Sequence, residues 1–258
     1  MLPLASDHAD VWLAWPDAAG AETLAACRAL LSPDERDKHD RFVFERDRKL
    51  YAVAHALLRR SLSRYAAVTP AAWRFVADDH GWPAVDPSAG LPAVGFNLSH
   101  TRGLCACVVS GAPAAGVDVE EMRAPVDLLE LAEHSFAAAE RAGLRALDGE
   151  TAMCDRFYAL WTLKESYIKA RGLGLALPLG AFAFRLEAER IELSLQPSLG
   201  DDARGWWFAL AAPSPQHRLA VALRRALAVT PTLTVYADAL GDVAPRVLAL
   251  PILARSDP

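Results

Sequence analysis

The chain has 258 residues, of which 53% are hydrophobic and 23% charged, and its formal net charge is −5 at pH 7. This length gives room for one large domain or two modest ones, each with its own core. The negative charge argues against general nucleic-acid binding, which usually needs a basic excess. No apolar run approaches the ~18 residues of a membrane helix, and the first twenty residues, with Asp7, Asp10 and Asp17, do not resemble a secretory signal. We therefore expect a globular cytoplasmic protein that binds neither nucleic acid nor membrane.

The four cysteines lack the C-x-x-C spacing of zinc sites; they are Cys27, Cys105, Cys107 and Cys154. Cys105 and Cys107 alternate within a predicted strand, so both are expected to face one core. This cysteine usage fits a reducing compartment.

Hydrophobic periodicity in the first half predicts strands and helices in a mixed order. Ser32 with Glu35 has the spacing of a capping box, and Pro33 suits the first position of the helix that follows. The segment 78–92, which contains His80-Gly81-Trp82-Pro83, is rich in turn residues and is expected to be a loop. Strands are predicted at 11–15, 73–76, 96–100 and 104–110, and further helices at 21–31 and 49–65.

The second half repeats this pattern after Gly111–Ala115, the best candidate for a boundary. Each half contains a long helix, then strands, and a final strand rich in valine and alanine. We expect an α+β (α/β) fold of two similar lobes, residues 1–112 and 113–258, with a cleft between them. The segment 226–258 has no clear assignment. Helices are predicted at 128–147 and 151–171, and strands at 117–120, 182–186, 192–195, 206–211 and 219–223.

The segment Trp161–Lys169 is the most informative for function. On a helix, Lys164 falls inside an apolar stripe, while Glu165 and Lys169 share its shoulder at i, i+4 spacing. A lysine on a core-facing stripe either extends its amine to water or meets an anion in a cleft. An ordinary salt-bridged surface helix is the alternative. The stripe consists of Phe157, Leu160, Trp161 and Ile168.

Gly116-Val117-Asp118-Val119-Glu120 reads as a strand that places Asp118 and Glu120 on the same face. Two carboxylates at that spacing repel each other, and a divalent cation removes the conflict. Oxygen donors of this kind suit magnesium. A strand with a solvated acidic edge is the other interpretation, and Glu121 is expected to be a simple surface charge.

Phe96-Asn97-Leu98-Ser99-His100 places a hydroxyl and an imidazole near the end of a predicted strand. Adjacent strand residues point to opposite faces, so Ser99 and His100 do not form a nucleophilic dyad. No G-x-S-x-G motif is present, which further disfavours a hydrolase. His100 is either a donor to a phosphate or a structural histidine.

Basic residues are frequent between residues 36 and 60, where they are mixed with acids. Such a mixture is usually a solvated helix face. The functional alternative is a pocket for a small polyanion. The basic residues are Arg36, Lys38, Arg41, Arg46, Arg48, Lys49, Arg59 and Arg60.

Taken together, these segments resemble the Sfp-type 4′-phosphopantetheinyl transferases of the holo-carrier-protein synthase superfamily. G-x-D-x-E and W-x-x-K-E-[SA]-x-x-K are weak signals alone, but together, preceded by F-N-L-S-H, they are highly specific. The resemblance continues through residues 172–179, so it covers roughly residues 30 to 186. Its motifs are Ser32-Pro33, His80-Gly81-Trp82-Pro83, Phe96–His100, Gly116–Glu120 and Trp161–Lys169.

The resemblance implies a reaction in which phosphopantetheine moves from coenzyme A to a serine of an acyl or peptidyl carrier protein. Adenosine 3′,5′-bisphosphate is the other product. It also implies a monomer of two pseudo-twofold-related lobes with the active site in the cleft between them. Broad-acting members of the family serve fatty-acid, polyketide and nonribosomal-peptide biosynthesis. The carrier protein served is not specified by the sequence.

The resemblance also implies roles for individual residues. Asp118, Glu120 and Glu165 would bind Mg2+ against the pyrophosphate of coenzyme A, with Glu165 as general base for the serine. Catalytic roles would fall to Glu165, Lys169 and Lys164, the two lysines neutralising pyrophosphate oxygens. Coenzyme A would contact Lys38, Lys49, Trp82, Pro83, Ser99, His100, Lys164 and Lys169.

The chain departs from the family pattern at two positions on the nucleotide side. Trp82 stands where many relatives have Lys or Arg, and Glu35 stands where some have a basic residue. Arg46 or Arg48 could replace the missing positive charge near the 3′-phosphate. The alternative function is a catalytically inactive module that binds coenzyme A or carrier protein. A magnesium-dependent nucleotide hydrolase is disfavoured because the phosphate-binding motif G-x-x-x-x-G-K-[ST] is absent.

Overall fold

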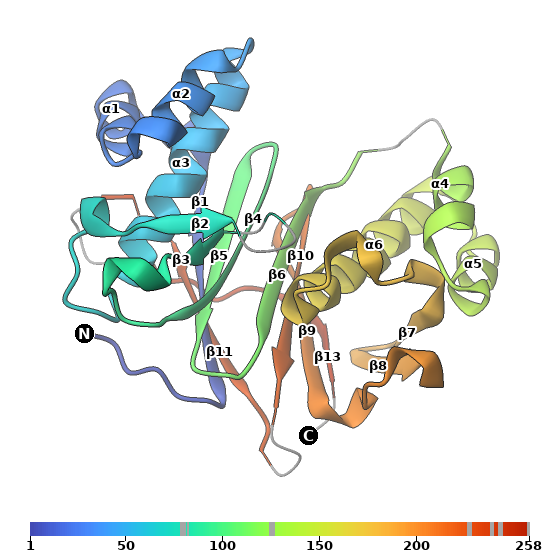
Figure 1. Cartoon of the computed structure of the whole chain (residues 1–258). Helices are drawn as coiled ribbons and strands as arrows, with labels where there is room; N and C mark the ends of the chain where they lie inside the picture. Colours follow the sequence, from blue (N-terminus) through green and yellow to red (C-terminus); the bar gives the residue numbers. More distant parts are fainter. Residues whose placement is uncertain are drawn as a thin grey trace. The chain divides into compact units, whose positions relative to one another are not determined.

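The computed structural model describes residues 1–77, 81, 83–123, 127–225, 229–237, 240–241 and 245–256. The chain forms two compact units (Figure 1). Unit 1 comprises Met1–Ala115 and Thr232–Ala249, and unit 2 comprises Gly116–Pro231 and Leu250–Pro258. No helix in these described ranges is long and apolar enough to cross a membrane.

Unit 1 contains a five-stranded sheet of order β12-β11-β1-β5-β4, with helix α3 packed on it. A separate hairpin pairs β2 with β3. The strands are β1 (His8–Ala14), β2 (Phe75–Ala77), β3 (Pro83–Val85), β4 (Gly95–Thr101), β5 (Leu104–Ser110), β11 (Thr232–Ala237) and β12 (Arg246–Val247). The helices are α1 (Ala21–Ala29), α2 (Pro33–Arg41) and α3 (Glu45–Leu62).

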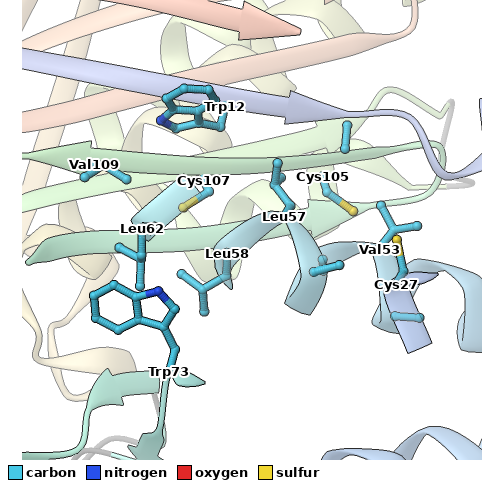
Figure 2. Packing of buried hydrophobic residues seen from close by; sticks show 14 of the residues in the cluster. Trp12, Cys27, Val53, Leu57, Leu58, Leu62, Trp73, Cys105, Cys107 and Val109 are labelled. Carbon is cyan, nitrogen blue, oxygen red and sulfur yellow. The ribbon is translucent and has the colours of Figure 1, made fainter. Parts of the chain in front are cut away.

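The core of unit 1 lies between α3 and the sheet. Figure 2 shows Leu57, Leu58 and Leu62 of α3 beside strand β5, which carries Cys105 and Cys107. Both cysteines are fully buried free thiols, and burial raises the pKa of each above its usual value. The prediction that they share one core is confirmed.

Helix α2 begins as the sequence predicts. The Ser32 hydroxyl accepts a hydrogen bond from the Glu35 amide at 3.2 Å, and the Glu35 carboxylate accepts one from the Ser32 amide at 2.8 Å. Pro33 occupies the first turn, where its missing N–H leaves no bond unmade. The predicted capping box is confirmed.

Unit 2 contains a six-stranded sheet of order β6-β10-β9-β13-β8-β7. Helix α6 lies across one face of this sheet, with α4 and α5 beside it (Figure 1). The strands are β6 (Ala115–Glu121), β7 (Phe182–Glu187), β8 (Arg190–Leu195), β9 (Trp206–Ser214), β10 (His217–Arg224) and β13 (Ile252–Arg255). The helices are α4 (Leu128–Ser135), α5 (Ala138–Arg145) and α6 (Glu150–Arg171).

The two units share a connection pattern. In unit 1, β1, α3, β4 and β5 occur in this order along the chain, with other elements between them. In the sheet, β5 lies between β1 and β4. In unit 2, β6, α6, β9 and β10 occur along the chain in the same way, and β10 lies between β6 and β9 in the sheet. The fold is α+β, as predicted, and the repeated helix-then-strands order is present in both units.

Two predictions differ from the structure. The segment 78–92 was expected to be a loop, but Pro83–Val85 forms β3, which pairs antiparallel with β2. The range 113–258 was assigned to one lobe, but Thr232–Ala249 belongs to unit 1. The reason is that β11 pairs in parallel with β1, a partner more than two hundred residues away, in a register that sets Val11 opposite Val235.

Candidate active site

Strand β6 and helix α6 bring the predicted acidic and basic residues together in unit 2. The Lys169 ammonium lies 2.7 Å from Oδ1 of Asp118, and both side chains are largely buried. A glycine at position 116 allows this approach: a Cβ there would collide with the Ser166 carbonyl oxygen and lie 2.6 Å from the Ala170 nitrogen. The G-x-D-x-E motif therefore combines a close strand–helix contact with a carboxylate that faces the helix.

Glu165 joins the same cluster. Burial raises the pKa of its carboxyl, the negative charge of Asp118 raises it further, and Lys169 partly offsets the shift. The carboxylates of Asp118 and Glu165 thus repel each other, and the positive charge of Lys169 partly offsets this repulsion. The cluster is a site where a second cation would be stabilised.

Glu120 also lies on β6 and is half-buried. Burial raises the pKa of the Tyr158 phenol on α6, and the charge of Glu120 adds to that shift. Because strand residues alternate, Glu120 lies on the same face of β6 as Asp118. Its neighbour Glu121 forms an ion pair with Arg123, in keeping with the simple surface role predicted for it.

Unit 1 contains a cavity of about 630 Å³ that several predicted nucleotide contacts line. Lys38, Pro83 and His100 are among its lining residues, and the Lys38 ammonium lies 5.4 Å from the centre of the Tyr51 ring. Its other described walls are largely apolar or aromatic: Phe42, Leu50, Tyr51, Phe75, Val76, Ala77 and Leu98. Apolar and aromatic walls together with Lys38 and His100 suit a nucleobase and its phosphates, and two acids, Glu35 and Asp47, also line the cavity.

Three other predicted coenzyme A contacts are not among the described residues that line this cavity. Ser99 and Lys49 do not line the described part of this cavity. Ser99 is buried on β4 between Leu98 and His100, and because strand residues alternate it points to the opposite face. Trp82 lies outside the described residues.

Glu35 lines the same cavity with its charge already paired. Its carboxylate accepts hydrogen bonds from the Arg59 guanidinium at 2.6 Å and is 2.9 Å from Nδ1 of His55. Although burial alone raises the pKa of the Glu35 carboxyl, His55, the Ser32 amide and Arg59 together lower it to about 2. The acid that departs from the family pattern is therefore part of an ion-pair network within unit 1.

Comparison with known proteins identifies the family. Residues 114–222 match the 4′-phosphopantetheinyl transferase superfamily, and residues 15–112 match the 4′-phosphopantetheinyl transferase N-terminal family. The chain is 32% identical to the 4′-phosphopantetheinyl transferase HetI of Nostoc sp. over 76% of its own length and 78% of that protein. The chain belongs to the 4′-phosphopantetheinyl transferase superfamily.

Other relatives agree. The 4′-phosphopantetheinyl transferase Sfp of Bacillus subtilis is 34% identical, over 62% of this chain and 69% of that protein. The human L-aminoadipate-semialdehyde dehydrogenase-phosphopantetheinyl transferase is 27% identical, over 80% of this chain and 70% of that protein. The resemblance inferred from the motifs is confirmed, and the chain is a transferase.

The donor set of the transferase fits a magnesium ion in chemical type. Asp118, Glu120 and Glu165 supply hard oxygen donors, and the mutual repulsion of Asp118 and Glu165 favours a cation. Among the described residues, no three acidic, histidine or cysteine side chains are close enough to form a complete metal cage. Magnesium is commonly bound by one or two carboxylates together with substrate phosphates, so a partial set is suited to it.

The placement of Lys164 differs from the prediction. Its side chain is 1% exposed and lies in the core of unit 2, where its ammonium pairs with Glu140 at 2.8 Å. The same ammonium donates to the backbone oxygens of Leu179 at 2.8 Å and Phe182 at 2.7 Å. All three of its N–H donors are used, so the predicted contact with pyrophosphate is replaced by an internal one.

Two residues that contact α6 of the transferase were not identified by the sequence analysis. Glu140, near the start of α5, is the anion that Lys164 meets. Asp201 accepts hydrogen bonds from the Tyr167 hydroxyl at 2.8 Å and from Arg171 at 2.7 Å, which holds the C-terminal end of the helix. A buried lysine signals that an acid must lie nearby, but only the tertiary structure shows which one.

Proposed function

We propose that this transferase moves 4′-phosphopantetheine from coenzyme A to a serine hydroxyl of an acyl or peptidyl carrier protein, with Mg2+ as its metal. The observation that carries the proposal is the cluster of Asp118, Glu165 and Lys169 at the contact of β6 with α6. It combines oxygen ligands for a cation with an ammonium group for phosphate oxygens.

In the proposed reaction, the serine oxygen forms a bond to the phosphorus that bears pantetheine. The bond from that phosphorus to the bridging pyrophosphate oxygen breaks, and its electron pair leaves with adenosine 3′,5′-bisphosphate. The serine proton passes to Glu165, directly or through water. As a carboxylate, Glu165 can accept this proton as a general base.

Asp118, Glu120 and Glu165 would hold the magnesium ion. When bound, the ion supplies charge neutralisation on the pyrophosphate and acts as a Lewis acid. Lys169 would donate to a pyrophosphate oxygen and stabilise negative charge that develops on the leaving group. Positioning and charge neutralisation are the main contributions expected from the protein in phosphoryl transfer.

The nucleotide end of coenzyme A is proposed to bind the cavity of unit 1. Its volume of about 630 Å³ is within the range of small-molecule sites. Lys38 and His100 would meet phosphate groups, and Pro83 would lie beside the adenine. Lys49, Ser99 and Trp82 are further candidate contacts from the family motif.

The proposal is tested by incubating the protein with coenzyme A, Mg2+ and several apo-carriers, then weighing the carriers by mass spectrometry. A gain of one phosphopantetheinyl group on any carrier supports it. No gain on fatty-acid, polyketide or nonribosomal-peptide carriers would instead favour an inactive module that binds coenzyme A or carrier protein.

We place the enzyme in the cytoplasm and expect a monomer.

A further inference from the structure

The buried ion pair of Glu140 and Lys164 lies outside the reaction proposed above. Each side chain is 1% exposed, and the two charged groups are 2.8 Å apart. Burial raises the pKa of Glu140 and lowers that of Lys164, because it disfavours both charges. Each group therefore depends on the other to stay ionised.

The pair joins three segments of unit 2. Glu140 accepts hydrogen bonds from the backbone nitrogens of Ala137, at the start of α5, and of Phe184, on β7, each at 2.8 Å. Lys164 of α6 donates to the backbone oxygens of Leu179 and Phe182, which flank the start of β7. The pair thus ties α6 to α5 and β7 at a single point.

That point is placed where it can fix the rotation of α6 about its own axis. Successive helix residues are about 100° apart, so the direction of Lys164 sets the direction of Glu165. On the other side of the helix, Gly116 lets β6 touch α6 at Ser166 and Ala170. The helix is held from two sides, one by the ion pair and one by the strand that carries Asp118.

We propose that Glu140 and Lys164 are a positioning pair, which fixes α6 so that Glu165 and Lys169 face Asp118. The inference rests on the proposed function and extends it to two residues that do not touch the substrate. Stability alone gives no reason for an ion pair here, because well-packed apolar residues in place of a buried pair are often as stable. A fixed helix orientation does give one, since small errors in placing a catalytic group reduce rates strongly.

The test compares Lys164→Met, Glu140→Gln and the double variant with the natural protein. Each single variant leaves one buried charge without its partner, so its melting temperature should fall. The double variant has no lone buried charge and should recover part of that loss. If a single variant does not fold, the double variant carries the test.

Measurements of kcat and Mn2+ binding distinguish a positioning role of the pair from a purely stabilising one. In the double variant, kcat should fall about tenfold or more while the KM for coenzyme A changes less than about threefold. Binding of Mn2+, a spectroscopic substitute for Mg2+ measured by electron paramagnetic resonance, should weaken as Glu165 and Asp118 lose their alignment. The control is Ile191→Ala, a buried position on β8, which should lower the melting temperature with little change in kcat or Mn2+ binding.

Two results would overturn the inference. A double variant with natural kcat and Mn2+ affinity would show that the pair only stabilises the fold. A Lys164→Met variant with a strongly raised KM for coenzyme A and no energetic coupling to Glu140→Gln would make Lys164 a substrate ligand. If the natural protein modifies no carrier, the proposed function fails, yet the coupling and Mn2+ measurements still test the pair.

Discussion

The Lys169 ammonium and the Asp118 carboxylate are 2.7 Å apart, so the lysine proposed to bind pyrophosphate is also the partner of a proposed metal ligand. A cation at Asp118 must therefore share or displace this contact. In the proposed mechanism, the Asp118–Lys169 contact would link magnesium binding to coenzyme A binding, because pyrophosphate would offer Lys169 an alternative partner.

Replacing Lys169 with Gln should separate these two effects. Without the competing ammonium, Mn2+ alone should bind the free protein about tenfold more tightly, because one positive charge near Asp118 is lost. The KM for coenzyme A should rise roughly tenfold or more, because a charged hydrogen bond to pyrophosphate is lost. Electron paramagnetic resonance titration and steady-state kinetics measure the two changes.

Lys169→Arg is the matched control, because it keeps the charge. It should bind Mn2+ much as the natural protein does. Weaker Mn2+ binding in Lys169→Gln than in the natural protein would show that the lysine supports the cation rather than competing with it.

Gly116→Ala should destabilise unit 2, because a Cβ at this position meets the backbone of α6 at Ser166 and Ala170. Backbone atoms cannot move aside as a flexible side chain can, so we expect a loss of about 1–3 kcal/mol in the free energy of unfolding. Urea denaturation measures this loss, and transfer activity should fall with it as β6 moves away from α6.

Gly143→Ala on α5 is the control for the glycine change. A Cβ there meets nothing within 4 Å, and alanine favours a helix over glycine by roughly 0.5–1 kcal/mol. This variant should be as stable as the natural protein or slightly more so. Equal losses in both variants would contradict the packing role assigned to Gly116.

Glu35 should contribute stability that depends on pH. Its folded pKa of about 2 lies below the ordinary value of 4.5, so its contribution is complete above about pH 4.5 and is lost as the pH falls toward 2. The shift corresponds to roughly 2–3 kcal/mol after allowing for partial exposure. The free energy of unfolding of Glu35→Gln should approach that of the natural protein as the pH falls through this window, and a constant difference at all pH values would contradict the ion-pair network.

Local signals predicted much of this fold from sequence. The capping box of Ser32 and Glu35 needs only neighbouring residues, and the long helices and hairpin strands follow from periodicity within short windows. The segment after residue 225 was not predicted, because β11 is stabilised mainly by pairing with β1, far away in the chain. Such a partner leaves no local pattern in the sequence.

The candidate site shows the same division. Spacing alone placed Asp118 and Glu120 on one face of a strand and grouped Glu165 with Lys169 on one helix. The position of Lys164 in an apolar stripe showed that it needed an anion, but Glu140 was not identified, because it lies on another helix. The reason for glycine at 116 also required the structure, since the contact is with the backbone of α6.

The most direct test of the account measures transfer by Asp118→Ala and Glu165→Ala variants whose folding is checked by circular dichroism. An apo-carrier that the natural protein modifies is incubated with coenzyme A, Mg2+ and each variant, and its mass is followed over time. We predict that transfer is abolished in both variants, with a loss of at least about a hundredfold for Glu165→Ala as a general base. Transfer at the natural rate by either folded variant would contradict the proposed mechanism.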